Sequence, residues 1–279
     1  MNRAIRVAVG MAALAALASQ AGAVQLRYKF HAGDAHTYKM TMKGRGETSS
    51  SAMPQAMRME MAIETVTAQK VVSVAEGGAT AQVEQRVKTG KLTFLAGGDW
   101  RSSDLPQQRM LLTMDTRGRV LQAQATDAQG KDIMGASMQG VDWSQMAAAM
   151  AFPEQDLKVN DTWDASGALK MTGMTMQVQS RSRLLHVLTY KGRPCAQIRT
   201  AFQIPLESLM PKTSGQGPAP NMQGKIAGEV TWYFDHAKGV VVDETGKIQM
   251  RMKMSLTVGE KTTDTTSSMM MNVMSVLQD

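Results

Sequence analysis

The sequence predicts a mainly β protein made of curved antiparallel sheets, half-barrel or sandwich-like, built as one unit or as two related lobes. Three observations predict this class. Apolar and polar residues alternate through most of the chain, clusters of Gly, Asp and Asn separate the alternating runs, and one short stretch near residues 142–152 has α-helical spacing. The clearest alternation places methionine at every second position, in Met57–Met61 and again in Met250–Met254.

The first half of the chain predicts strands joined by turns. Alternation predicts strands at 26–30 and 38–42, followed by a polar loop at 44–51. Residues 57–74 predict one long strand, or two strands joined by a bulge. The glycines of Glu76-Gly77-Gly78 predict a hairpin turn into a further strand at 79–94, and an exposed loop is expected from Gly97 to about Pro106.

The second half contains the single helical pattern. Asp142 is a suitable N-cap, Gln145 completes the spacing of a capping box, and Pro153 ends the pattern. We expect this helix to cover an open face or edge of the sheet. The stretch Pro211–Gly224, rich in proline and glycine, predicts an excursion between strands.

The two halves resemble each other in their turns. Each contains an Asp-x-x-(x)-Gly element, at Asp115–Gly118 and Asp235–Gly239, which predicts a tight turn between antiparallel strands. The predicted organisation is a signal peptide (1–23), an N-terminal β lobe (24–136), a helix and connection (137–152) and a C-terminal β lobe (153–279). The alternative is that 24–279 form one domain.

Three stretches resemble an uncharacterised family of exported bacterial β-rich proteins, a domain of unknown function. Leu26–Asp34, followed by Tyr38, is similar to the opening of these proteins. Pro153–Trp163 resembles their mid-chain element, although glycine is commoner at the position of Asn160, and Phe234–Gly239 resembles their late Phe-Asp-x-x-x-Gly turn. The resemblance spans most of the chain after residue 23 and implies a β-rich fold with no assigned activity.

The first residues have the pattern of a secretory signal. Arg3 and Arg6 provide the positive region, 7–17 the short apolar core, and Ala21-Gly22-Ala23 the cleavage site, so Val24 is the expected mature N-terminus. Because the apolar run is shorter than a spanning helix, we expect cleavage and a periplasmic or secreted protein; an uncleaved anchor is the alternative. No cysteine follows the cleavage site, so a lipid anchor is not expected.

Charge and composition argue against nucleic-acid binding. The formal net charge is +7, spread along the chain without a concentrated basic run, and aromatic residues make up 5%. Nucleic-acid binding usually needs a basic face and often stacking aromatics. No later segment is apolar enough to cross a membrane, so the mature chain is not expected to be integral to one.

Candidate catalytic groups are few. The single cysteine, Cys195, lies in an alternating run and predicts a small buried residue without a nearby base. His31, Asp34 and His36 form an incomplete metal-ligand pattern that is typical of a solvated turn. The common nucleophile-elbow, zinc-helix and phosphate-loop motifs do not occur, so we expect no catalytic residue, no metal and no cofactor.

The methionine runs are the candidate ligand-binding residues. They comprise Met57, Met59, Met61, Met250, Met252 and Met254. Alternation places three thioethers of each run on one face of a strand, which predicts either plain core, an adaptable apolar surface for a lipid-like ligand or protein partner, or a Cu(I) site. Successive sulfurs would lie about 7 Å apart along one strand, and no histidine or cysteine adjoins them.

These patterns predict a non-enzymatic exported protein that binds a hydrophobic ligand, or an envelope protein partner, through a concave sheet face. The alternative is an envelope structural or interaction protein without a small-molecule ligand. A Cu(I)-binding protein and a hydrolase are the remaining hypotheses, and the sequence names no residue pair for the latter.

Overall fold

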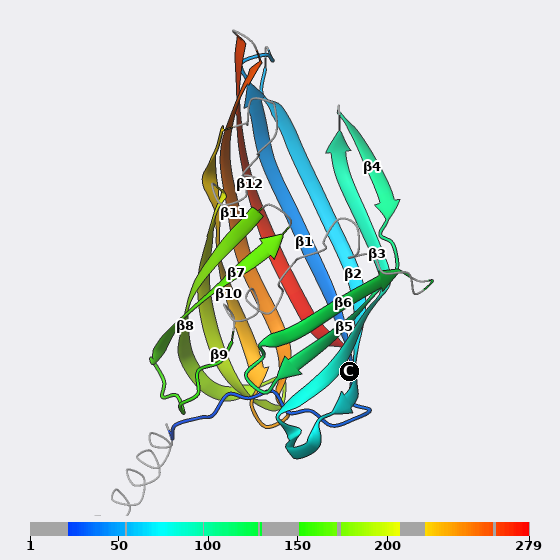
Figure 1. The fold of residues 1–279 in the computed structure, drawn as a ribbon, viewed down its shortest axis with the longest axis vertical. Coiled ribbons are helices and arrows are strands. Elements are labelled where there is room, and N and C mark those ends of the chain that lie inside the picture. Colours follow the sequence, from blue (N-terminus) through cyan, green and yellow to red (C-terminus); the bar gives the residue numbers. More distant parts are fainter. Residues whose placement is uncertain are drawn as a thin grey trace, which may run out of the picture.

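The structure, a computed structural model, describes residues 22–53, 55–96, 98–127, 129, 151–171, 174–206, 221–258 and 261–278. These residues form one antiparallel sheet of twelve strands that is not closed, and one short 3-10 turn, η1 (Glu76–Gly78), lies among them (Figure 1). The strands are β1 (Ala35–Ser50), β2 (Met57–Val74), β3 (Thr80–Ala96), β4 (Asp99–Asp104), β5 (Gln108–Asp115), β6 (Val120–Asp127), β7 (Thr162–Met171), β8 (Met174–Tyr190), β9 (Arg193–Pro205), β10 (Asn221–Asp235), β11 (Val240–Val258) and β12 (Lys261–Gln278).

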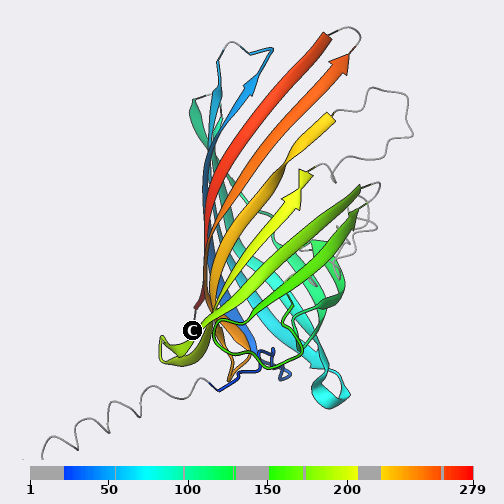
Figure 2. The same ribbon diagram turned by 90° about the vertical axis from the view of Figure 1, so that its left-hand side faces the viewer.

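The sheet order joins the two ends of the chain at its centre. The order is β6-β5-β3-β2-β1-β12-β11-β10-β9-β8-β7, and β3 pairs with β4 along its end and with β5 along its start. Figures 1 and 2 show that the sheet curls, so that edge strands β6 and β7 lie on the same side of central strands β1 and β12. We call the concave side of this curl the inner face.

The predicted fold class is confirmed as a mainly β, unclosed antiparallel sheet, and the half-barrel is the arrangement found. Strands assigned to the two predicted lobes meet in the β1–β12 pair, so both lobes contribute to one continuous sheet. The helix expected at 142–152 lies outside the described residues except for Ala151 and Phe152, which are not helical. Most of the predicted signal peptide and of the excursion at 211–224 also lies outside them.

Two predicted loops are strands instead. Residues 44–50 continue β1, and Asp99–Asp104 form β4, which pairs with the end of β3. The glycines that suggested a loop, Gly44 and Gly46, lie opposite methionines of β2 and β12. Glycine ordinarily weakens a strand, but here Gly44 makes room for the side chains of Met61 and Met271, and Gly46 allows the backbone of β12 to approach closely.

Two hydrophobic clusters fill the inner face at one end of the sheet, which we call its base. The larger packs inner-face residues of β7–β10 against Leu26, Phe152 and Leu157, and Trp232 and Phe234 lie at its centre. The smaller joins β2, β3 and β5, with Val83 almost fully buried. A short chain segment, Val24–Phe30, runs across both clusters, because Leu26 packs in the first and Phe30 against the second.

This N-terminal segment (Val24–Phe30) is not the strand that alternation predicted at 26–30. Apart from the single bridge between Val24 and Leu157, it lies outside the sheet. The Arg27 guanidinium donates to the carbonyls of Pro153 (2.7 Å) and Glu154 (2.6 Å). Tyr28 lies between aromatic rings, with centroids 5.6 Å from Phe152 and 5.3 Å from Phe234.

The two similar Asp turns hold the N-terminal segment. Asp115 and Asp235 are buried, and one carboxylate oxygen of each accepts two backbone N–H groups of its own turn. The Tyr28 N–H donates to the carbonyl of Thr116 in the first turn (2.7 Å). The Lys29 ammonium donates to the carbonyl of Ala237 in the second (2.9 Å). The predicted tight turns are therefore confirmed, and both face the same segment.

Replacing Gly239 by alanine tests this packing. Gly239 has φ 71°, and an added Cβ would collide with the backbone nitrogen of Lys29. We expect Gly239→Ala to lower the free energy of unfolding in urea by about 2 kcal/mol or more. Gly192→Ala is the matched control: φ is 74° with open space around it, and about 1 kcal/mol is expected. Equal losses would contradict a packed N-terminal segment.

Candidate functional site

The register brings the two predicted methionine runs onto one face of the sheet. Met59 and Met61 of β2 lie opposite Gly46 and Gly44 of β1. On the other side of β1, the same glycines lie opposite residues of β12, which in turn pair with β11. The inner-face rows are Met59–Gly46–Met269–Met250–Ile226–Ile204 and Met61–Gly44–Met271–Ile248–Gly228–Phe202.

Met269 and Met271 are the functional candidates that sequence reasoning missed. They connect β2 to β11 across the centre of the sheet, whereas Met270 between them faces outward and is 45% exposed. The feature of the sequence that could have identified them is the two-residue period of β12, which places Met269 and Met271 on one face, and not the run of consecutive methionines. We call the set Met59, Met61, Met250, Met252, Met269 and Met271 the methionine face.

Side chains of the two inner-face rows pack over Gly44 and Gly228. A Cβ added to Gly44 would lie 3.0 Å from Cγ of Met271 and 3.1 Å from Cγ of Met61. One added to Gly228 would lie 2.7 Å from the ring of Phe202. Flexible thioethers and a ring therefore cover backbone that bears no side chain, which gives a smooth and deformable apolar floor.

The methionine face is neither core nor fully exposed surface. All six of its residues are half-buried, and none belongs to the two base clusters. Of the remaining predicted residues, Met57 at the start of β2 is 48% exposed, and Met254 is half-buried beyond the two rows. On the opposite face, Arg251 and Lys253 are exposed, as the alternation predicts. Among the described residues, this apolar face is therefore only partly covered on the concave side.

Two further rows connect the methionine face to the base cluster. They are Ile63–Met42–Val273–Gly246–Val230–Thr200 and Thr65–Met40–Ser275–Glu244–Trp232–Ile198. Across all four rows, Glu244 is the single charged side chain among these described positions. It is half-buried beside Trp232 and makes no hydrogen bond or ion pair with another described residue.

The surroundings of Glu244 are poor in water. Burial raises the pKa of the Glu244 carboxyl above its ordinary value. Burial also raises the pKa of Tyr28 to about 12, and the Glu244 carboxylate contributes to that shift. The Trp232 indole N–H already donates to Thr200 Oγ1 (3.0 Å), which also contacts Ser182 Oγ (2.8 Å). The neighbouring polar groups are therefore engaged with one another, while Glu244 is available to a ligand.

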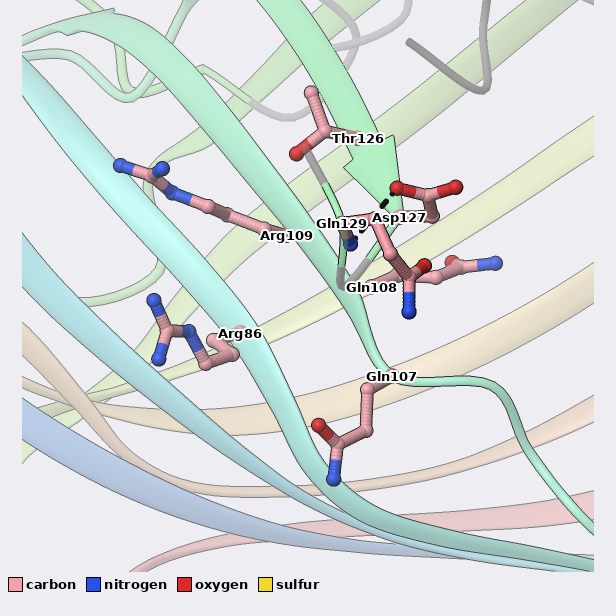
Figure 3. A pocket seen from close by; sticks show the side chains of 7 residues that line it. All are labelled: Arg86, Gln107, Gln108, Arg109, Thr126, Asp127 and Gln129. Carbon is pink, nitrogen blue, oxygen red and sulfur yellow. Dashed lines mark hydrogen bonds between the residues drawn. The ribbon is translucent and has the colours of Figure 1, made fainter. Parts of the chain in front are cut away.

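A separate polar pocket of about 340 Å³ lies where β3, β5 and β6 meet, as Figure 3 shows. Arg86 and Arg109 extend side by side from neighbouring strands. Both contact the carboxylate of Glu84, at 3.3 Å and 2.6 Å, so their charge is partly neutralised. Gln108 and Asp127 also line this pocket, although they belong to the opposite face of the sheet. The pocket therefore extends around the end of the β5–β6 pair, and among the described residues no apolar side chain lines it.

A tyrosine pair packs beside the β8–β9 turn, on a different face from the methionines. The rings of Tyr190 and Tyr233 stack with centroids 3.8 Å apart. The Tyr190 hydroxyl and the Lys191 ammonium both donate to Asp243 Oδ2, each at 2.8 Å. Burial, followed by the hydrogen bond to Asp243, raises the pKa of Tyr190 to about 12. The hydroxyl, ammonium and carboxylate groups are thus hydrogen-bonded to one another, and their contacts hold the turn in place.

The remaining titratable residues that the sequence singled out lie either in the buried interior or in an exposed turn. Cys195 is fully buried, as predicted, and burial raises the pKa of its thiol. His31 Nδ1 lies 3.1 Å from Asp34 Oδ2 in an exposed turn. In the part of the chain that the structure describes, no three His, Cys, Asp or Glu side chains are grouped to hold a metal ion.

Among the described residues, no helix has the length and apolar character needed to span a membrane.

Comparisons of the chain with protein-family models and with curated proteins find no match.

Replacing Glu244 by glutamine tests its burial. The folded protein binds a proton at Glu244 more tightly than the unfolded chain, whose carboxyl titrates near its ordinary value of 4.5. Wild-type stability should therefore fall as pH rises from about 4.5 through the raised pKa, because the unfolded state has already lost the proton. Glu244→Gln should lack this fall and be the more stable protein above that window.

The measurement is urea unfolding of both proteins from about pH 4 to about pH 8. The difference between them isolates Glu244, since other titrating groups are common to both. A difference that stays constant across the window would show that Glu244 is solvated like an ordinary surface carboxyl.

Proposed function

We propose that this protein binds a lipid-like apolar ligand on its methionine face and has no catalytic role. The observation that carries the proposal is the continuity of the two inner-face methionine rows across β2, β1, β12, β11, β10 and β9, with half-buried side chains throughout. An accessible apolar surface of this extent is uncommon unless something covers it.

The chemistry of methionine favours a ligand of variable shape. Its unbranched thioether rotates freely and repacks around different partners, unlike Leu or Ile, whose rotamers are more restricted. Gly44 and Gly228 under the side chains leave room for such repacking. The larger base cluster contains Phe152, Trp163, Trp232 and Phe234, whose fixed packing stabilises the fold. The chain thus separates rigid core from adaptable surface.

One observation favours a protein partner as the second candidate. Trp100 of β4 is 57% exposed and lines a shallow outer-face depression of about 410 Å³ together with Met270. Exposed Trp and Met are enriched at protein interfaces. Charged Lys43, Arg45 and Glu60 share this depression. The proposal for the inner face is preferred because its apolar rows are uninterrupted by charge.

The signal pattern of residues 1–23 supports export to the periplasm or beyond, and the resemblance of Leu26–Asp34 and Phe234–Gly239 supports membership of the exported β-rich family. Both are proposals. An envelope location would place the protein where lipid-like ligands are available.

Adjacent residues of β12 provide a matched test of the methionine face. Met269→Asp places a carboxylate on the inner face, whereas Met270→Asp places the same group on the outer face one residue away. We expect Met269→Asp to weaken binding of a fluorescent single-chain lipid probe at least tenfold, because the charge must be desolvated beneath the ligand. Met270→Asp should bind as wild type.

Titration of each purified protein with the probe, followed by fluorescence, measures this effect. Circular dichroism and thermal unfolding establish that both variants are folded. Equal binding by the two folded variants, or no binding by wild type, would contradict the proposal. Met252→Asp on β11 and Met59→Asp on β2 extend the test to the other methionine strands.

A further inference from the structure

Across the four inner-face rows, Glu244 is the single charged side chain among the described positions, and its place is informative. Glu244 lies two rows below the methionine face, toward the base, between Ser275 of β12 and Trp232 of β10. The four inner-face rows above and including it otherwise hold Met, Ile, Val, Gly, Phe and Trp with three small hydroxyl residues. A lone carboxylate in such surroundings loses hydration without gaining a partner.

Among the described residues, no basic side chain lies in the four inner-face rows to pair with this carboxylate. The basic side chains of β11 nearest in sequence, Lys247 and Arg251, are exposed, and the register places them on the outer face. Tyr28 is the titratable neighbour from the N-terminal segment, and its charged form would be anionic. A ligand that brings a positive charge with hydrogen-bond donors would complement this site.

We infer that the ligand is a single-chain amphiphile with a protonated amine, which contacts Glu244 while its alkyl chain lies over the methionine face. The inference rests on the proposed function. Glu244 and Ile248 are four residues apart on β11, about 13 Å along the strand, so a dodecyl chain reaches from the carboxylate to the row of Met271. The chain can run along the strands without crossing another charge.

Three ligands with the same chain separate the head group from the tail. They are dodecylamine, dodecanol and dodecanoate, each titrated below its micelle concentration at about pH 8, where an alkylamine is protonated and an ordinary carboxyl is ionised. We expect wild type to bind the amine at least tenfold more tightly than the alcohol, and the alcohol more tightly than the carboxylate. A charge-assisted hydrogen bond is sufficient for a preference of this size.

Glu244→Gln keeps the shape of the side chain and removes its charge. We expect this variant to lose the preference for the amine over dodecanol. Glu64→Gln, at an exposed outer-face position of β2, is the control and should retain the preference.

The outcomes distinguish the two proposals. If dodecanol binds but the amine shows no preference that depends on Glu244, the head-group inference is overturned while binding on the methionine face stands. A preference for dodecanoate would overturn it in the same way. If none of the three ligands binds the folded wild type, the proposed function fails and the head-group inference fails with it.

Discussion

One constraint governs this molecule: a single sheet must bury one face, and here the sheet folds that face inward and closes it at one end. The N-terminal segment (Val24–Phe30) makes this closure possible, because it crosses both base clusters and touches both Asp turns. Arg27 ties it to the chain after residue 151. Strands from distant parts of the sequence are thereby held in one curl.

The rest of the inner face follows from this closure. Aromatic residues with fixed packing gather at the base, where Phe152 and Phe234 are fully buried. Farther along the strands nothing comparable covers the sheet among the described residues, and the side chains change to methionine over glycine. The same curl thus has a rigid end that provides stability and a soft surface that is suited to a ligand.

Local chemistry made part of this architecture predictable. Period-two methionines in Met57–Met61 and Met250–Met254 predicted the strand faces, and the Asp turns and the turn at Gly77 were found where expected. Such features depend on residues close in sequence. Their side-chain periodicity or backbone conformation is fixed by sterics alone.

The remainder depended on partners far along the chain. Residues 44–50 have a loop-like composition, yet β1 continues through them because β12, more than 200 residues later, pairs with it. The same pairing places Met269 and Met271 beside Gly46 and Gly44 and completes the methionine face. Composition also gave no reason to single out Glu244, whose isolation appears only when six strands are in register.

The most direct test of the central claim is a methyl NMR spectrum of protein labelled with ¹³C at its methionine methyl groups, recorded with and without saturating dodecylamine. We expect the resonances of Met61 and Met271, in the row that the dodecyl chain reaches, to shift, while those of Met270 and Met274, both outward-facing and exposed, stay in place. Shifts confined to the outward-facing methionines, or none at any methionine, would contradict a binding surface on the inner face.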